Sequence, residues 1–278
     1  MVQQIPVETL HLFPVLDKML IDLLRSLSPG DWNESTVARL WTVKDIAAHL
    51  LDGNVRAIAA SWGYEPPPPN IEINSYRDLV NYLNSLNATW VDAMKRVSPH
   101  LLIDQLESTG KQYIEYLHSL DPFASAKYSV AWAGEETSLN WFHIAREYTE
   151  KWHHQQQIRD AVGADGLLTN ELFYPCADTF MYALPHNYRN IEAPEGFTIA
   201  ITIDTIAGGI WYLKKTPANW ELTKINQTPF ALSIVLDADT AWRMFTKAIT
   251  PSEAQSHSIV KGDERLAEAF FSTIAVMA

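Results

Sequence analysis

Glu150 and His154 are the residues of this chain whose types and spacing point most directly to chemistry. Both lie in the segment Arg146–Arg159, whose composition is typical of a helix. A separation of four residues places a carboxylate and an imidazole on one helical face, one turn apart, where both can reach a common point. The other interpretation is an exposed i,i+4 pair on a solvated helix. The spacing by itself leaves both interpretations open.

A second segment, Trp41–Leu51, reads as another helix and carries a single histidine, His49. Two imidazole nitrogens and one carboxylate from two helices would hold a divalent metal and leave a coordination position open, as in catalytic sites. The helical face of His49 also carries Asp45, Asp52 and Arg56. Periodicity does not distinguish a polar cavity from a solvated face, so the sequence leaves open which of the two this face lines.

Three arginines are candidate carboxylate clamps, because a guanidinium can grip a carboxylate with two parallel hydrogen bonds. They are Arg56, Arg146 and Arg159, and ordinary surface ion pairs are an equally good interpretation of each. Trp132 lies in the loop before the helix that carries Glu150 and His154, and we expect it to line the pocket beside the metal. Gln157 continues the face of Glu150 and His154, and we expect both Trp132 and Gln157 to contact a cofactor.

The composition excludes several classes of function. A formal net charge of −12 over 278 residues argues against a nucleic-acid or anionic-membrane partner, which would need basic patches. The apolar runs are too short for a membrane span, and the start of the chain lacks the pattern of a secretory signal. Cys176 is the single cysteine, which favours a reducing compartment and a buried small residue rather than a nucleophile. We therefore expect a soluble, cytoplasmic protein that acts on a small molecule.

Hydrophobic periodicity divides the chain into two domains. Residues 1–165 predict a helical bundle, and residues 166–278 predict a smaller α+β domain. The expected bundle helices are Val7–Leu27, Thr42–Trp62, Ser75–Val97, Ser98–Leu120 and Ser138–Val162. Beyond them we expect a short helix over Thr169–Leu184, strands over Thr198–Asp204, Gly209–Lys214, Trp220–Lys224, Ala231–Leu236 and Ser258–Lys261, a helix through Ala241–Phe245, and a last helix over Asp263–Val276.

The segment Trp41–Leu50 resembles the second-helix signature of the mycothiol-dependent maleylpyruvate isomerase N-terminal domains, which belong to the DinB-like superfamily of metal-binding four-helix bundles. The Glu150–His154 element is similar to that family's second ligand pair. Leu236–Arg243 and Val260–Asp263 look like the sterol-carrier-like domain that is often fused behind such bundles. The resemblance implies an up-down bundle with His49, Glu150 and His154 as metal ligands, followed by a sterol-carrier-like domain.

The same resemblance implies an activity. We expect a thiol transferase or isomerase that depends on a divalent metal, zinc before nickel, and uses a low-molecular-weight thiol on a small electrophilic substrate. Many members of the family carry an aspartate three residues after the ligand histidine, whereas this chain has Gln157 there. Bundles of this type often pair through apolar faces, so a homodimer is a further expectation.

The alternative is a non-catalytic protein that binds a small molecule and has a structural or vestigial metal site. A fourth protein ligand such as His143, seven residues before Glu150, would close the site and favour that alternative.

Overall fold

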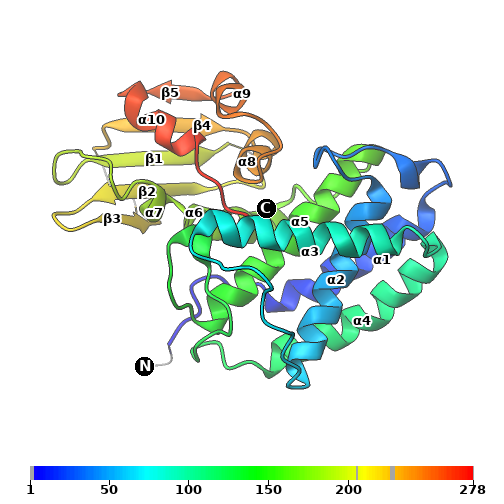
Figure 1. Cartoon of the computed structure of the whole chain (residues 1–278). Helices are drawn as coiled ribbons and strands as arrows, with labels where there is room; N and C mark the ends of the chain where they lie inside the picture. Colours follow the sequence, from blue (N-terminus) through cyan, green and yellow to red (C-terminus); the bar gives the residue numbers. More distant parts are fainter. Residues whose placement is uncertain (1–2, 205, 226–228, 278) are drawn as a thin grey trace. The chain divides into compact units, whose positions relative to one another are not determined.

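A computed structural model describes residues 3–204, 206–225 and 229–277 of the chain. It confirms the expected fold class, with a helical N-terminal half followed by an α+β part built on a five-stranded sheet (Figure 1). The chain forms two compact units: one holds the chain up to Glu8, Pro122–Glu150 and Gly166–Val276, and the other holds Thr9–Asp121 and Lys151–Asp165. The boundary between the two units therefore falls within one helix, Asn140–Val162. The predicted domain boundary at residue 165 stays a prediction.

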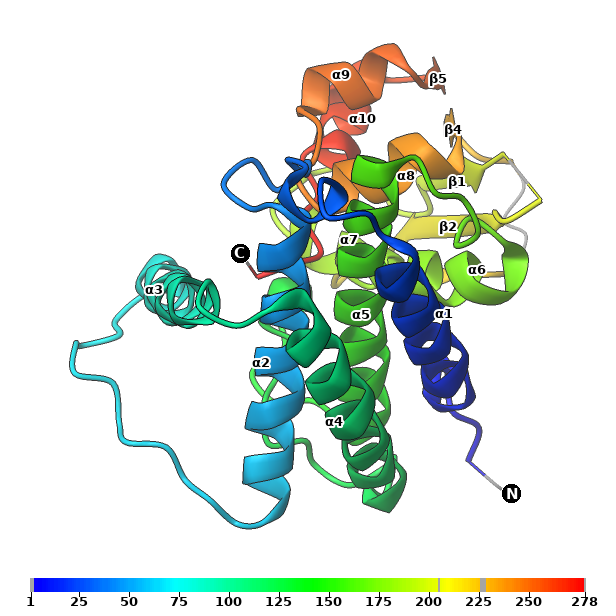
Figure 2. The same cartoon turned by 90° about the vertical axis from the view of Figure 1, so that its right-hand side faces the viewer.

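The helical half follows the predicted order. Its helices are α1 (Phe13–Ser26), α2 (Val43–Ser61), α3 (Tyr76–Met94), α4 (Pro99–Ser119) and α5 (Asn140–Val162), with short 3-10 turns η1 (Leu10–Leu12), η2 (Asp31–Asn33) and η3 (Ala131–Ala133). The first helix begins at Phe13 rather than Val7, because Pro14 occupies its first turn, where a missing backbone N–H costs nothing. Helix α4 packs against both α2 and α1, and α3 runs across α2 (Figure 2).

The helix that carries His49 has a well-defined start. The Thr42 hydroxyl accepts the backbone N–H of Asp45, and the Asp45 carboxylate accepts the backbone N–H of Thr42 at 2.9 Å. This reciprocal capping box satisfies two of the backbone donors that a helix N-terminus leaves unpaired. It also fixes the first turn of the helix from which His49 projects two turns later.

One apolar cluster holds the helices of the second unit together. It contains Leu20 and Leu24 of α1, Ile46 and Leu50 of α2, and Ile158 of α5, all nearly excluded from solvent. The apolar residues of α2 recur at helical spacing, so one side of that helix faces this core. Residues 151–159 of α5 are all buried, so the bundle encloses the polar side chains of this stretch together with the apolar ones.

The sheet of the other unit has the order β3-β2-β1-β4-β5. Its central strand pairs antiparallel with β2 and parallel with β4, with Ile201 opposite Trp211 and Ile234. The strands are β1 (Thr198–Ile203), β2 (Ile210–Lys215), β3 (Trp220–Thr223), β4 (Leu232–Leu236) and β5 (Ile259–Lys261), and the accompanying helices are α6 (Asn170–Met181), α7 (Leu184–Asn187), α8 (Ala238–Phe245), α9 (Pro251–Ser256) and α10 (Glu264–Phe271).

The last helix is shorter than predicted. It ends at Phe271 rather than Val276, and the backbone N–H of Ala275 donates instead to the carbonyl of Phe245 at 3.0 Å. The tail is thus held by a tertiary hydrogen bond, which helical periodicity cannot reveal.

Candidate metal centre

Three side chains predicted to bind a metal meet in the structure. His49 projects from α2, and Glu150 and His154 lie one turn apart on the continuous helix α5. One ligand atom from each of the three lies within 4.8 Å of the others. His154 is buried, whereas His49 and Glu150 are partly exposed. The two imidazole rings meet edge to face with their centroids 4.6 Å apart. The bundle thus brings together two nitrogen donors and one carboxylate, a ligand set suited to zinc or nickel.

Gln157 holds the inner histidine in place. Its Oε1 atom lies 2.8 Å from Nδ1 of His154, and both side chains are buried. An amide oxygen can only accept, so this contact places a hydrogen on Nδ1 and leaves the lone pair of the ring on Nε2. A histidine whose second nitrogen is fixed in this way is oriented as metal-ligating histidines usually are. Gln157 was predicted to contact a cofactor, and the structure gives it this contact with the candidate ligand.

Trp41 lies against both histidines. Its ring centroid is 4.9 Å from that of His49 and 6.3 Å from that of His154. Two hydrogen bonds to its backbone carbonyl, from the N–H of Thr36 at 3.1 Å and from the Thr36 hydroxyl at 2.8 Å, fix the chain at this residue. Sequence reasoning did not single out Trp41. The sequence held one clue to the role of Trp41: it is an aromatic residue just before a helix cap, and apolar side chains at that position often pack against the first turns of the helix.

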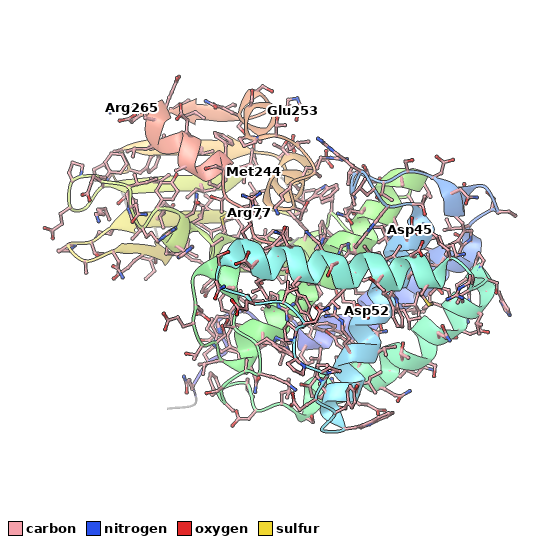
Figure 3. The ribbon with its side chains drawn as sticks, in the orientation of Figure 1. Asp45, Asp52, Arg77, Met244, Glu253 and Arg265 are labelled. Atoms are coloured by element: carbon pink, nitrogen blue, oxygen red, sulfur yellow. The ribbon has the colours of Figure 1, made fainter. Side chains whose placement is uncertain are left out.

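The other charged residues on the face of His49 already have partners at or near the same helix. Asp45 and Asp52, both on α2, are labelled in Figure 3. Asp45 belongs to the capping box, and the Asp52 carboxylate pairs with the Arg56 guanidinium at 2.9 Å. Burial raises the pKa of Asp52, against the lowering effect of Arg56. Arg56, predicted as a carboxylate clamp, therefore lies on this face with a carboxylate of the chain itself already beside it.

His143 stands apart from the candidate ligands. Its Nδ1 atom lies 3.1 Å from Nη2 of Arg146, and its Nε2 atom lies 3.9 Å from the Glu147 carboxylate. Burial, with a smaller contribution from Arg146, lowers the pKa of His143 to about 4 although Glu147 opposes it. Among the described residues, the group that could hold a metal does not include His143. The fourth ligand that would have favoured a closed, structural site is thus not found there.

The remaining predicted site residues lie in different surroundings. The Arg159 guanidinium donates to the backbone carbonyls of Asp165 at 2.6 Å and Met19 at 3.2 Å. Trp132 is buried against Phe142 at 5.8 Å, and its indole N–H has no hydrogen-bond acceptor among the described residues. Arg146 pairs with the neighbouring Glu147. The roles of the arginines in gripping a carboxylate and of Trp132 in lining a pocket stay predictions.

Cys176 is confirmed as a buried residue. It is fully excluded from solvent, and burial, together with the charge of Glu150, raises the pKa of its thiol well above the ordinary value. A thiol held in its protonated form is a poor nucleophile. Any sulfur nucleophile used by this protein would therefore come from a separate thiol compound.

The donor set fits a divalent cation. Neutral imidazoles and a carboxylate are the ligands of catalytic zinc sites, and three protein ligands leave room for a further molecule. The hydrogen bond between His154 and Gln157 and the ring of Trp41 against both imidazoles are further features expected around such an ion. The arrangement can hold a metal and present it to a small molecule.

Comparison with protein families identifies relatives for both the sequence and the fold. The family model for the mycothiol maleylpyruvate isomerase N-terminal domain matches residues 15–159. A crystal structure of a histidine-to-alanine mutant of the mycothiol-dependent maleylpyruvate isomerase aligns with a TM-score of 0.55 at 11% identity, covering 91% of each chain. A second crystal structure of that isomerase aligns with a TM-score of 0.52 at 12% identity, covering 84% of this chain and 86% of the other. At these identities the likeness of the structures concerns the fold.

No curated protein matches the sequence of the chain. Within the residues that the structure describes, no helix combines the length and the apolarity needed to cross a bilayer.

Proposed function

Because the chain belongs to the mycothiol maleylpyruvate isomerase N-terminal domain family, we propose that it is a metal-dependent enzyme that uses a low-molecular-weight thiol to transform a small electrophile. Two solved structures of similar fold are those of the mycothiol-dependent maleylpyruvate isomerase, so mycothiol and maleylpyruvate are the first thiol and the first electrophile to test. We extend the proposal to a thiol transferase or an isomerase, since both begin with the same addition of sulfur.

The observation that carries this proposal is the meeting of His49, Glu150 and His154 within 4.8 Å. Helix α5 alone could have produced the Glu150–His154 pair. His49 lies on α2 and comes close to Glu150 and His154 only when the helices pack as a bundle. A convergence of three such donors is what a metal site requires.

Each residue has a distinct task in this proposal. The imidazole nitrogens of His49 and His154 and the carboxylate of Glu150 would hold zinc or nickel. A bound divalent metal supplies one chemical effect, the deprotonation of a coordinated thiol at neutral pH. Gln157 keeps the Nε2 lone pair of His154 available, and the ring of Trp41 limits access of water to both imidazoles.

The balance of the reaction distinguishes the two activities. Addition of a thiol sulfur to a carbon–carbon double bond forms one C–S bond, and the carbon next to it takes up a proton. Reversal of both events after rotation about the new single bond returns the thiol unchanged and gives an isomer. Retention of the sulfur gives the product of a transferase. Arg56 and Arg146 are the proposed anchors for a substrate carboxylate.

The test combines metal analysis with activity. We expect near-stoichiometric zinc or nickel in the purified protein and its loss in His49→Ala, Glu150→Gln and His154→Ala variants. His143→Gln is the matched control, because His143 is a buried histidine of α5 outside the candidate group. It should keep its metal.

Activity is then measured with mycothiol or glutathione and maleylpyruvate, by following the loss of the conjugated double bond or its change of geometry. We expect turnover only in metal-loaded protein with a thiol present. A wild-type protein that takes up no metal after reconstitution would overturn the proposal. A metal-loaded protein inert towards every thiol would leave the metal site in place and refute the enzymatic role.

A further inference from the structure

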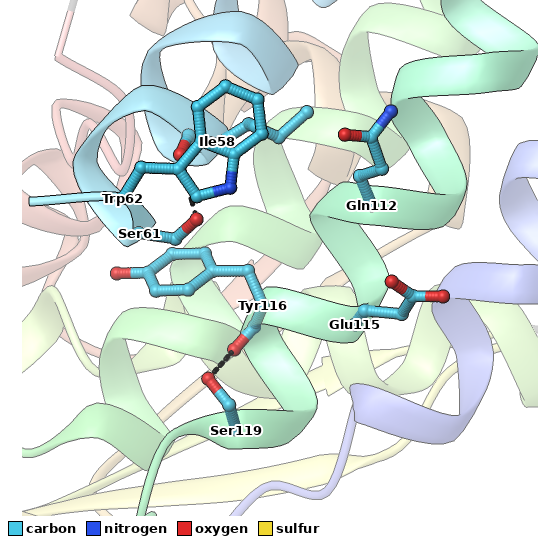
Figure 4. Close-up of a pocket in the computed structure, with 7 residues that line it drawn as sticks. All are labelled: Ile58, Ser61, Trp62, Gln112, Glu115, Tyr116 and Ser119. Carbon is cyan, nitrogen blue, oxygen red and sulfur yellow. Dashed lines mark hydrogen bonds between the residues drawn. The ribbon is translucent and has the colours of Figure 1, made fainter.

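A pocket of about 340 Å³ opens where helices α2 and α4 end (Figure 4). It lies wholly within one compact unit and is separate from the candidate metal centre. Its volume is at the lower end of the range for sites that bind small molecules. We refer to it as the α2–α4 pocket, and its lining comes from the last turn of α2 with its cap and from the last two turns of α4: Ile58, Ser61 and Trp62, then Gln112, Glu115, Tyr116 and Ser119.

The polar side chains from the helix ends present acceptor atoms to this pocket. The hydroxyl hydrogens of Ser61 and Ser119 are donated to backbone carbonyls one turn earlier, each at 2.7 Å. The amide nitrogen of Gln112 likewise donates within α4, to Ser108 at 3.4 Å. Lone pairs on these three oxygens therefore remain for a ligand. A ligand that satisfies them must carry several hydrogen-bond donors.

Glu115 adds a negative charge. Its carboxylate has no hydrogen bond and no ion pair with any residue that the structure describes. Figure 4 shows Glu115 and Gln112 on one side of the pocket and the rings of Trp62 and Tyr116 on the other. A carboxylate without a counter-ion beside acceptor oxygens favours a cation over a neutral molecule.

The two rings favour the same ligand. The Trp62 side chain is 77% exposed at the end of α2, an unusual position for a large apolar ring that contributes little to the core. The faces of Trp and Tyr rings carry partial negative charge and attract ammonium groups. The indole N–H of Trp62 lies at the edge of its ring and leaves the ring face open to a cation.

The backbone contributes as well. The pocket is formed at the C-terminal ends of two long helices, where the helix dipole carries partial negative charge. The last turn of α2 contains no basic side chain, and that of α4 contains His118, which does not line the pocket. The carboxylate, the ring faces, the acceptor oxygens and the helix ends therefore all favour a positively charged ligand.

We propose that the α2–α4 pocket binds the ammonium group of a small primary alkylamine. The three N–H donors of the ligand meet Glu115 and the acceptor oxygens, and its first methylene groups lie against Trp62 and Tyr116. This site is independent of the proposed thiol chemistry.

The test is calorimetric titration of the purified whole chain with n-butylammonium at low ionic strength, beside 1-butanol and tetramethylammonium. Butylammonium should bind, butanol should not, and tetramethylammonium should bind more weakly because it has no N–H donor. Salt should weaken the binding, since the attraction is between exposed charges. Failure of butylammonium to bind, or equal binding of butanol or of tetramethylammonium, would overturn the proposal.

Variants identify the site. We expect Glu115→Gln and Trp62→Leu each to weaken binding about fivefold, and Trp62→Phe to weaken it less, because a smaller ring face remains. Glu136→Gln is the matched control, because it removes the same charge from an exposed glutamate outside the pocket. An effect of Glu136→Gln equal to that of Glu115→Gln would show that the overall charge of the protein attracts the amine, which would refute the site. Circular dichroism verifies that each variant is folded.

Discussion

The Nδ1 atom of His154 lies 2.8 Å from the Oε1 atom of Gln157, three residues further along α5. The family resemblance of the sequence implies an aspartate at that position. An amide oxygen fixes the same tautomer as a carboxylate would, but it brings no charge to the histidine. The imidazole of His154 is therefore oriented for a metal by an uncharged partner.

This contact predicts the behaviour of two substitutions. Gln157→Leu removes the acceptor and should weaken metal binding about 10- to 100-fold, the usual effect of removing the hydrogen-bond partner of a metal-ligating histidine. Gln157→Glu restores an acceptor with a charge, so its affinity should equal or exceed that of the wild type. Competition with a chromophoric chelator measures both. Equal affinity of Gln157→Leu and wild type would show that the tautomer of His154 is fixed in another way.

Trp41 predicts a kinetic effect. Because its ring lies against both His49 and His154, Trp41→Ala should expose the centre and speed the release of metal to a chelator several-fold. The stoichiometry of metal should remain that of the wild type. Trp62→Leu serves as the control, because Trp62 is exposed at the far end of α2 and should not affect release. Unchanged release from Trp41→Ala would mean that the indole does not shield the site.

The burial of His143 leads to a prediction of how the free energy of unfolding depends on pH. Burial lowers the pKa of His143 from 6.5 to about 4 in the folded protein. Between these values the unfolded chain binds the extra proton, so the stabilisation present above pH 6.5 is lost as the pH falls towards 4. At about 1.4 kcal/mol per pKa unit the loss is on the order of 3 kcal/mol.

Urea unfolding of wild type and His143→Gln across this range measures that contribution. The free energy of unfolding of the variant should fall less than that of the wild type between pH 6.5 and pH 4. His100→Gln is the control, because the His100 side chain is 89% exposed and should leave the profile unchanged. Parallel profiles for wild type and His143→Gln would contradict the prediction.

Gly262, which follows β5, should tolerate no side chain. Its φ of +127° lies in a region that L-residues rarely adopt, and an added Cβ would come within 2.4 Å of the backbone carbonyl of Ala231. Gly262→Ala should therefore lower the free energy of unfolding by about 2–4 kcal/mol, from backbone strain and from the clash. Thermal unfolding measures the loss. Gly53→Ala is the control, because a Cβ there meets nothing within 4 Å. Its midpoint should match or exceed that of the wild type, since alanine favours a helix.

The sequence by itself determined the features that depend on neighbours along the chain. The cap of α2 at Thr42 with Asp45, and the shared face of Glu150 and His154, follow from spacings of three and four residues. Helix geometry is the same in any protein, so such spacings predict contacts directly. The identification of His49 needed more, because the sequence could not separate a cavity from solvent on its face, and the resemblance to a family supplied the missing link.

Only the tertiary structure decided which of several polar groups meet. Asp45, Asp52 and His49 share a helical face, yet among the residues that the structure describes only His49 of these three meets Glu150 and His154 of α5. The packing of Trp41 on both imidazoles and the parallel pairing of β1 with β4 join residues far apart in the chain. Such contacts depend on how whole helices and strands pack against one another, and packing is a sum over many side chains that no local pattern records.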